Sequence, residues 1–381
     1  MRSARACALR AALARVRCGA ARDGAGDSLA TAALAVTACA ITALGVILLA
    51  VGCDAAPAAS PGTSPRAWTG LPRDTRLARL ASPSLTAAAA ALRSGGQPAT
   101  AAREAALAAE PGAFWAAGQP GDIARVRALA GQAARSGQSP VIVAYDIPGR
   151  DACGHYSAAA RGPGANAYRA WIGQLAAAIG SAPALVIVEP DALADIVAGC
   201  VPAAAAGARY QLLSDAMGTL GALPRARVYL DAGNPGMVAD PARLAGPLRR
   251  AGVGDGSGFA ANVANFHWTS QVVSWSQQLE GALAKAAPGA GGPGAGRAAG
   301  AVIDTSRNGD GPYTGPGQPR WCNPPGRAPG PAPAVDPGPR GIDAYLWVKP
   351  AGDSDGPCNG GPPAGQFWPA YAAGLARAWR P

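Results

Sequence analysis

The sequence has very few of the side chains that metal sites and nucleic-acid interfaces use. Its 381 residues include only two histidines, His155 and His267, whose spacing fits no metal-ligand pattern. Only 15% of the residues are charged, and the net charge of +10 comes without a run of Lys or Arg. Part of it lies in the first 27 residues, which carry six Arg and two Asp. We therefore expect no resident metal, no cofactor and no nucleic-acid partner.

Charge is absent altogether from Ser28 to Gly52, a stretch rich in Leu, Val, Ile and Ala that is long enough to span a bilayer. It follows a basic region, as in an export signal or a membrane anchor. The sequence Ala50-Val-Gly-Cys53 resembles a lipoprotein processing site, where the Cys is lipidated after cleavage. Residues 1–53 are therefore a lipoprotein signal, an ordinary cleaved signal or an uncleaved anchor, and each alternative places the remaining chain in an oxidising exterior.

After a Pro/Ser/Ala linker at residues 54–67, the sequence predicts one large domain at residues 68–381. Two Ala-rich helical stretches, at 87–93 and 99–109, come first. An apolar strand-like run followed by a helical pattern then recurs roughly every 40 residues. The runs begin near Val141, Ala184, Ala226, Gly258, Ala301 and Ala344. This alternation predicts an α/β fold with a parallel sheet or barrel.

Residues 304–343 break this alternation, because they are rich in Gly and Pro and show no helical period. A loop of this length in a compact domain is typically a lid or a binding loop. A disordered insertion is the alternative. Trp321 and Cys322 within the segment favour an ordered loop.

Polar side chains follow each strand-like run, and parallel strands bring such residues to one rim of the fold. These residues are Tyr145, Asp146, Arg150, Asp151, Glu189, Asp191, Asp231, Asn262, Asn265, His267, Trp268, Asp304, Arg307, Lys349, Asp353 and Asp355. Crowded carboxylates raise one another's pKa, so that one of them holds a proton at neutral pH. Glycoside hydrolysis needs such an acid, a group that activates water, and aromatic rings that stack on sugars. Metal binding is the rival use of clustered Asp side chains.

Six motifs carry a family resemblance. They are Val143-Ala-Tyr-Asp-Ile-Pro-Gly-Arg-Asp151, Val188-Glu-Pro-Asp191, Val228-Tyr-Leu-Asp231, Ile303-Asp-Thr-Ser-Arg307, Trp321-Cys-Asn-Pro-Pro325 and Leu346-Trp-Val-Lys-Pro-Ala-Gly-Asp-Ser-Asp355. Together, and in this order over residues 110–380, they resemble glycoside hydrolase family 6, which comprises endoglucanases and cellobiohydrolases that cleave β-1,4-glucan. The resemblance implies an irregular, TIM-barrel-like β/α barrel of mostly parallel strands and hydrolysis with inversion at the anomeric carbon.

The resemblance also implies roles for individual residues. Asp191 matches the general acid, Asp151 the residue that holds the acid's raised pKa and helps to relay a proton, and Asp355 the proposed base. A water chain past a Ser is the alternative to Asp355, and Ser157 is our candidate for that Ser. The implied substrate-binding residues are Tyr145, Asp231, Trp321, Lys349 and Asp353, with Asn265 and Trp268 as further candidates. The alternative for Trp321 is a ring that packs beneath the long loop.

The sequence departs from the family pattern at several positions. Ala152 is inserted between Asp151 and Cys153, which shifts the register of Ser157, and Asp353 stands where Glu is usual. Asn234 and Met237 replace the usual His and Trp after the Asp231 motif, which predicts a weaker subsite for the leaving part of the glucan. The family's paired cysteines imply disulfides Cys153–Cys200 and Cys322–Cys358, which leaves Cys53 for a lipid.

The sequence therefore predicts a monomeric endo-β-1,4-glucanase that acts on β-1,4-glucan. The enzyme is expected to be secreted or anchored on the outer face of the cell membrane, with membrane contact only through the N-terminal segment or a lipid at Cys53. One alternative is a cellobiohydrolase, which requires loops that roof the site into a tunnel. The other is a surface carbohydrate-binding protein that has lost turnover.

Overall fold

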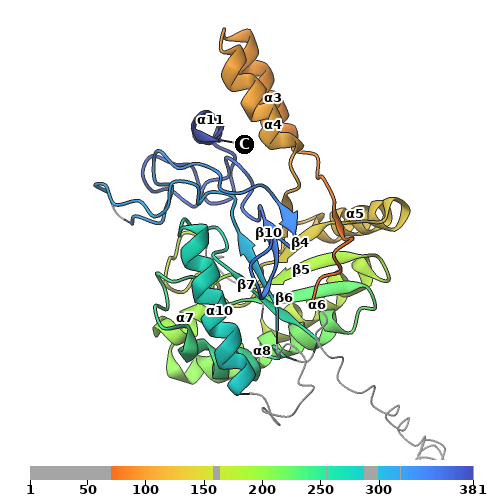
Figure 1. The fold of residues 1–381 in the computed structure, drawn as a ribbon. Helices are drawn as coiled ribbons and strands as arrows, with labels where there is room; N and C mark the ends of the chain where they lie inside the picture. Colours follow the sequence, from red (N-terminus) through yellow and green to blue (C-terminus); the bar gives the residue numbers. More distant parts are fainter. Residues whose placement is uncertain (1–69, 158–163, 255, 287–298, 318, 381) are drawn as a thin grey trace, which may run out of the picture. The chain divides into compact units, whose positions relative to one another are not determined.

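The computed structural model describes residues 70–157, 164–254, 256–286, 299–317 and 319–380 (Figure 1). The predicted export or anchor segment, the linker and Cys53 lie outside these residues, so the domain boundaries at 53 and 67 stay predictions. Among the residues described, no helix is both long and apolar enough to cross a membrane.

Eight strands form one sheet, in the order β2-β4-β5-β6-β7-β8-β10-β9. All neighbours are parallel except β9 and β10, which are antiparallel. The strands are β2 (Ala113–Ala116), β4 (Val141–Ala144), β5 (Ala184–Val188), β6 (Ala226–Asp231), β7 (Gly258–Ala261), β8 (Ala301–Asp304), β9 (Ala334–Val335) and β10 (Ile342–Leu346). A separate parallel pair joins β1 (Arg76–Leu77) to β3 (Gln138–Ser139).

The sheet curls so that β2 comes beside β10. Gly112, just before β2, forms a parallel bridge with Trp347, just after β10. Trp115 Nε1 donates to the carbonyl oxygen of Val348 at 2.8 Å. These contacts bring β2 beside β10, so the predicted irregular β/α barrel of mostly parallel strands is confirmed.

The strands are apolar on both faces because each face is covered. On β5, Val186 and Val188 belong to the apolar cluster that includes helix residues such as Leu213. Leu185 and Ile187 belong to a second cluster, which is built mainly from strand residues inside the barrel. Each fully buried side chain of this size stabilises the fold by roughly 1.5–3 kcal/mol, which explains why these runs were recognisable in the sequence.

Most helices connect the strands and cover the outer face of the sheet, whereas the first two helices and the last pack against one another (Figure 1). They are α3 (Pro83–Ser94), α4 (Pro98–Ala109), α5 (Asp122–Ser136), α6 (Ala165–Ile179), α7 (Ala192–Ala198), α8 (Ala203–Gly221), the 3₁₀ helix η1 (Pro241–Leu244), α9 (Ala245–Arg250), α10 (Thr269–Lys285) and α11 (Pro369–Ala378). Pro at the first turn starts α3, α4 and α11, where its missing N–H costs nothing. Left-handed Gly137 and Gly199 end α5 and α7.

The long segment after β8 contains no helix in its described residues, as the sequence predicts. Its one regular element there is the short strand β9, which pairs with Ala344 and Tyr345 of β10. The disulfide Cys322–Cys358 ties the segment to the chain that follows β10. The segment is therefore attached at the carboxyl ends of the strands, where the predicted site residues lie.

Candidate active site

Several residues at the carboxyl ends of the strands have a left-handed backbone. The φ angle is 55° at Asp151, 48° at Glu189, 68° at Asp191 and 65° at Asn262. Such a conformation costs roughly 1 to 3 kcal/mol per non-Gly residue and persists only where the surroundings fix it. The fold therefore holds this rim in a specific arrangement, which is a property of functional sites.

Asp191 lies between β5 and α7, and its backbone N–H donates to Asp231 Oδ2 at 2.8 Å. Its carboxyl group is partly exposed and has no hydrogen-bond partner among the described residues. Enough protein surrounds it for desolvation to raise its pKa well above the ordinary value, and nearby carboxylates raise the pKa further. Those carboxylates are Asp231, Asp195, Asp151 and Asp355. Asp191 therefore holds its proton more tightly than a free Asp side chain.

Asp231, at the end of β6, is fully buried beneath Asp191. Its Oδ2 atom accepts the N–H groups of Asp191 and Gly233, at 2.8 and 3.0 Å. Its Oδ1 atom has no partner among the described residues. Burial raises the pKa of Asp231 to about 7, although both backbone N–H groups oppose the rise. Asp231 thus fixes the backbone of Asp191, and its nearby carboxyl group raises the pKa of Asp191.

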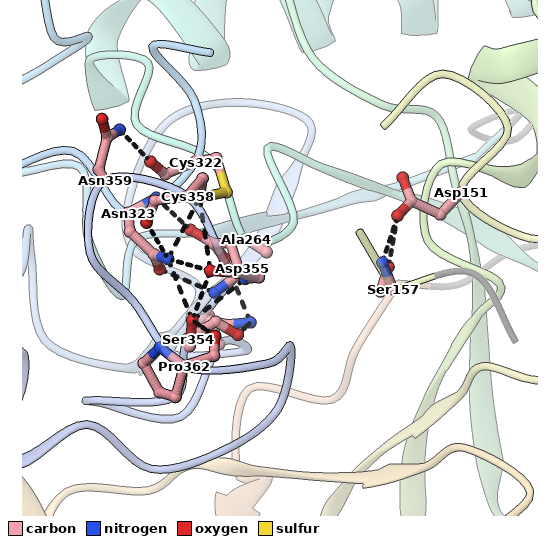
Figure 2. Close-up of a disulfide and its surroundings, with 12 residues drawn as sticks. Asp151, Ser157, Ala264, Cys322, Asn323, Ser354, Asp355, Cys358, Asn359 and Pro362 are labelled. Carbon is pink, nitrogen blue, oxygen red and sulfur yellow. Dashed lines mark hydrogen bonds and ion pairs between the residues drawn. A yellow bond between two sulfur atoms is a disulfide. The ribbon is translucent and has the colours of Figure 1, made fainter. Parts of the chain in front are cut away.

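Asp151, Ser157 and Tyr145 form one hydrogen-bonded chain. Ser157 donates to Asp151 Oδ2 from its backbone N–H at 2.6 Å and from Oγ at 2.8 Å (Figure 2). Tyr145 Oη lies 2.8 Å from the same Ser157 Oγ. Burial, followed by the charge of Asp191, raises the pKa of Tyr145 well above its usual range, so the phenol stays neutral. The structure therefore places Ser157 on Asp151 despite the inserted Ala152.

Asp355 lies in a buried ionic network on the other side of the view in Figure 2. Arg307 binds both of its oxygens, at 2.9 and 3.0 Å. Lys349 Nζ lies 3.2 Å from Oδ1, and the N–H of Asn323 donates to Oδ2 at 3.0 Å. Burial would raise the pKa of Asp355, but the charges of Arg307 and Lys349 outweigh burial and lower it. The group is therefore ionised and fixed in position.

Asn323 is a residue of this network that the sequence reasoning missed. Its Oδ1 atom accepts the N–H of Asp355 at 2.8 Å, so the two residues bind each other reciprocally. Its Nδ2 atom donates to Ser354 Oγ at 3.0 Å and to the carbonyl oxygen of Gly356 at 2.8 Å. The position of Asn323 directly after Cys322 in the Trp-Cys-Asn motif was the available signal. Arg307 was predicted to lie at the rim, and the structure shows that it binds both oxygens of Asp355.

Asp353 and Trp321 are two further residues that the sequence predicts for substrate binding. Burial raises the pKa of Asp353 to about 6, and Lys349 and Arg307 oppose the rise. Trp321 is 39% exposed and packs edge-on against Tyr156, with ring centroids 5.7 Å apart. Its ring therefore lies at the surface beside the segment that carries Asp151 and is not packed beneath the long loop.

Asn265 and Trp268 are not in contact with the carboxylates in the described structure. The Oδ1 atom of Asn265 accepts the N–H of its neighbour Phe266 at 2.9 Å. Trp268 is 50% exposed and lies against the backbone of Gly311, where a Cβ atom would come within 2.1 Å of the ring. A direct contribution from either residue to the carboxylate cluster is not supported by these contacts.

One group of three potential metal ligands occurs within the described ranges: Cys153, Asp195 and Cys200. Its two sulfur atoms form a disulfide bond, so they are not free to bind a metal ion. The Asp cluster at the strand ends is organised by Arg, Lys and backbone N–H groups.

The family model "Glycosyl hydrolases family 6" matches residues 74–378, which is most of the chain and contains all the residues of this site. The chain belongs to glycosyl hydrolases family 6. The resemblance carried by the six motifs is thereby confirmed.

Curated relatives and solved structures of family 6 agree with this assignment. The chain is 40% identical to Endoglucanase 1 of Streptomyces sp. over 246 residues, which cover 64% of this chain and 62% of that protein. It is 40% identical to Endoglucanase A of Thermobispora bispora over 249 residues, which cover 65% and 50% of the two chains. The matched region thus spans between half and two thirds of these relatives' length.

The structure resembles the endoglucanase Cel6 from Mycobacterium tuberculosis, with a TM-score of 0.69 and 35% identity. That comparison covers 80% of this chain and 97% of the other. It also resembles the catalytic core of the cellobiohydrolase Cel6A from Chaetomium thermophilum, with a TM-score of 0.67 and 26% identity, covering 82% and 100% of the two chains.

Both disulfides that the family resemblance implied are present, and each ties a segment at the rim of the site. Cys153–Cys200 closes 47 residues and Cys322–Cys358 closes 36 residues. We expect the Cys322→Ser/Cys358→Ser double variant to lose about 3–4 kcal/mol of the free energy of unfolding, because the unfolded chain regains the entropy of that loop. Urea unfolding of the two proteins measures the difference. A reductant should then lower the midpoint of the wild type more than that of the variant, and an equal effect on both would contradict the expectation.

Proposed function

We propose that this family 6 protein is an endo-β-1,4-glucanase that hydrolyses internal bonds of β-1,4-glucan with inversion. The single observation that carries the proposal is the pairing of a partly exposed, proton-retaining Asp191 with an ionised Asp355 at the same rim. An acid that protonates the leaving oxygen and a charge that assists attack by water are the two requirements of inverting hydrolysis. The two curated relatives named above, both 40% identical, are endoglucanases and support the same activity.

In this mechanism Asp191 donates its proton to the glycosidic oxygen as the bond breaks. Desolvation and the neighbouring carboxylates keep the proton on Asp191 until the leaving oxygen takes it. Asp231 fixes the backbone of Asp191 through the 2.8 Å hydrogen bond to its N–H. Asp151 supplies negative charge on the other flank, which favours the return of a proton to Asp191 after each turnover.

The contacts of Asp355 favour a water relay over direct proton abstraction. The two oxygens of Asp355 accept three hydrogen bonds, two from Arg307 and one from Asn323, and Lys349 lies beside them as an ion-pair partner, so most of their lone pairs are engaged. Its lowered pKa also makes it a weak base. Ser157 has a hydroxyl bound to Asp151 and is placed to pass a proton from the attacking water to that carboxylate. In this role Asp355 acts mainly through its charge.

The substrate-binding roles are part of the proposal. Tyr145 presses on the distorted sugar at the reacting position, Asp231 lines the cleft, and Lys349 and Asp353 hydrogen-bond sugar hydroxyls. Trp321, with an exposed ring, stacks on a sugar face. Asn265 and Trp268 are further candidates for contacts with the glucan.

The pKa shifts predict an activity profile that is limited on both sides. The acid must be protonated, so kcat/KM should fall as the pH rises through the raised pKa of Asp191. Asp355 must be ionised, so kcat/KM should fall on the acid side only below the ordinary Asp range, because its pKa is lowered. Initial rates on a soluble cello-oligosaccharide, measured between about pH 3 and 9, follow the fall of kcat/KM on both the acid and the basic side. A profile that declines from pH 4 upward would contradict the assignment of Asp191.

We also propose that the protein is exported, is monomeric and meets its glucan outside the cytoplasm. The two disulfides support an oxidising compartment. Whether the chain is free or lipid-anchored at Cys53 is decided by mass analysis of the mature N-terminus.

The test of the function is hydrolysis of carboxymethylcellulose by the full chain. An endoglucanase lowers the viscosity of the solution early, while few reducing ends have appeared. A cellobiohydrolase releases cellobiose from chain ends with little early loss of viscosity. Binding of the glucan with unchanged viscosity and no reducing ends would replace the proposal with a carbohydrate-binding protein.

A further inference from the structure

Three buried charged side chains lie beneath the segment that carries Asp151. They are Glu189 after β5, Asp195 on α7 and Arg209 on α8, and we call this group the loop clamp. Their exposed fractions are 0%, 1% and 7%. Charged side chains are rarely buried unless they are paired with an opposite charge or hydrogen-bonded.

The hydrogen bonds of the loop clamp go to the backbone of residues 146–152. Glu189 accepts the N–H of Asp146 at 3.1 Å and that of Ile147 at 3.0 Å. Arg209 Nη2 donates to the carbonyl oxygen of Pro148 at 3.2 Å and also to that of Gly149. The first half of the segment is therefore held by partners on two different elements.

Asp195 holds the other half. Its Oδ2 atom accepts the N–H of Ala152 at 2.8 Å and lies 3.8 Å from Arg209 Nη1. Burial raises the pKa of Asp195, while the N–H groups of Ala152 and Cys153 and the charge of Arg209 oppose the rise. The hydrogen bonds and the charge of Arg209 favour the carboxylate form, whereas burial and the neighbouring carboxyl groups of Asp151, Asp191 and Asp231 oppose it.

Asp151 needs such support because its own backbone is left-handed, with a φ angle of 55°. The neighbouring disulfide fixes the chain only at Cys153. Without Asp195, the N–H of Ala152 loses its hydrogen-bond partner, so the peptide that follows Asp151 is held less firmly even though Ser157 still binds the Asp151 carboxylate. A misplacement of about 1 Å in a site of this kind lowers the rate about 100-fold.

We propose that Asp195 is a positioning residue for the hydrolysis: through Ala152 it holds Asp151 in place beside Asp191. This inference rests on the proposed function. Asp195 also lies one helical turn after Asp191, where its N–H donates to the carbonyl oxygen of Asp191 at 2.8 Å, and its charge contributes to the rise of the pKa of Asp191. The charged or titratable groups that face Asp191 are Asp231 from β6, Asp195 from α7, Asp151 and Tyr145 from the chain after β4, and Asp355 from the chain after β10.

The first experiment needs no activity. Hydrogen exchange of the peptide that contains Ala152 is compared in the wild-type full chain, Asp195→Ala and Asp195→Asn. We expect exchange to be at least about ten times faster in Asp195→Ala, because the hydrogen bond to a charged acceptor is lost. Asp195→Asn keeps an acceptor oxygen and should exchange nearly as slowly as the wild type. Equal exchange in the wild type and Asp195→Ala would overturn the hydrogen-bonding role.

The second experiment measures kcat/KM against pH for the same three proteins. Asp195→Ala should lose about 10- to 100-fold. Asp195→Asn should keep most of the rate, but its basic limb should move to lower pH, since a negative charge near Asp191 is gone. Asp215→Ala, which removes an exposed carboxylate of α8 paired with Arg169, is the matched control and should change neither quantity.

The outcomes separate this inference from the proposed function. Normal rates and an unmoved basic limb in both Asp195 variants, with an active wild type, would overturn the positioning role. If the wild type hydrolyses no glucan, the proposed function and the role in catalysis both fail, while the exchange experiment still decides whether Asp195 holds the loop.

Discussion

Replacing Asp191 with Ala is expected to lower hydrolysis of carboxymethylcellulose by about 10²- to 10⁴-fold, because the glycosidic oxygen then leaves without a proton. The fold should survive the change, since the Asp191 side chain makes no hydrogen bond within the described structure and the bond to Asp231 uses its backbone N–H. Release of reducing ends by the wild type and the variant measures the effect. Asp74→Ala, a change at an exposed carboxylate, serves as the control and should keep full activity.

A substrate whose leaving group needs no proton tests whether Asp191 acts by donating one. A cello-oligosaccharide with a dinitrophenyl leaving group departs without protonation, so Asp191→Ala should lose far less activity on it than on carboxymethylcellulose. An equal loss on both substrates would mean that Asp191 positions the substrate or the water rather than donating a proton. A variant that keeps wild-type activity on both would exclude Asp191 as the acid.

The positions of six of the parallel strands were predictable because their residues are apolar on both faces. Runs such as Ala184–Val188 and Ala226–Asp231 are bordered by polar residues, so their ends were visible in the sequence. The strand β2 was not predicted; it follows directly after the break at Pro111-Gly112. The helix α5 was missed because small Ala side chains make up half of its buried face. Short or Ala-rich elements take their structure from the packing around them, which the sequence pattern does not display.

The carboxylates of the site were predictable because each follows a strand, but their partners were not. Asp355 depends on Arg307 and Asn323, which lie 48 and 32 residues away along the chain. Asp195 is an ordinary helix residue in the sequence, and its burial beneath Ala152 appears only when α7 and the chain after β4 come together. Residue type and spacing identify groups that perform chemistry. The residues that hold them depend on contacts between distant parts of the chain.

Arg307→Met is expected to destabilise the protein by roughly 3–5 kcal/mol at neutral pH, which is the largest effect on stability that the site offers. Arg307 is fully buried, binds both oxygens of Asp355 and donates to the carbonyl oxygen of Ala264. The apolar variant leaves Asp355 with only Lys349 and the Asn323 N–H, so a buried carboxylate loses its main counter-charge. Urea unfolding at pH 7 measures the cost.

The dependence of that cost on pH and on Asp355 distinguishes an unpaired charge from a simple packing defect. Asp355 has a pKa lowered by Arg307 and Lys349, so its ionised form stabilises the wild type above the ordinary Asp pKa, and this stabilisation is lost as the pH falls through the lowered value. The loss of unfolding free energy caused by Arg307→Met should therefore shrink between about pH 7 and pH 4, because Asp355 takes up a proton in the variant once its counter-charge is gone. The double variant Arg307→Met/Asp355→Leu should recover part of the loss, because no buried charge is then left unpaired. A penalty that is the same at both pH values, and is not reduced by the second substitution, would show that Arg307 acts through its packing against Phe266 rather than through the charge of Asp355.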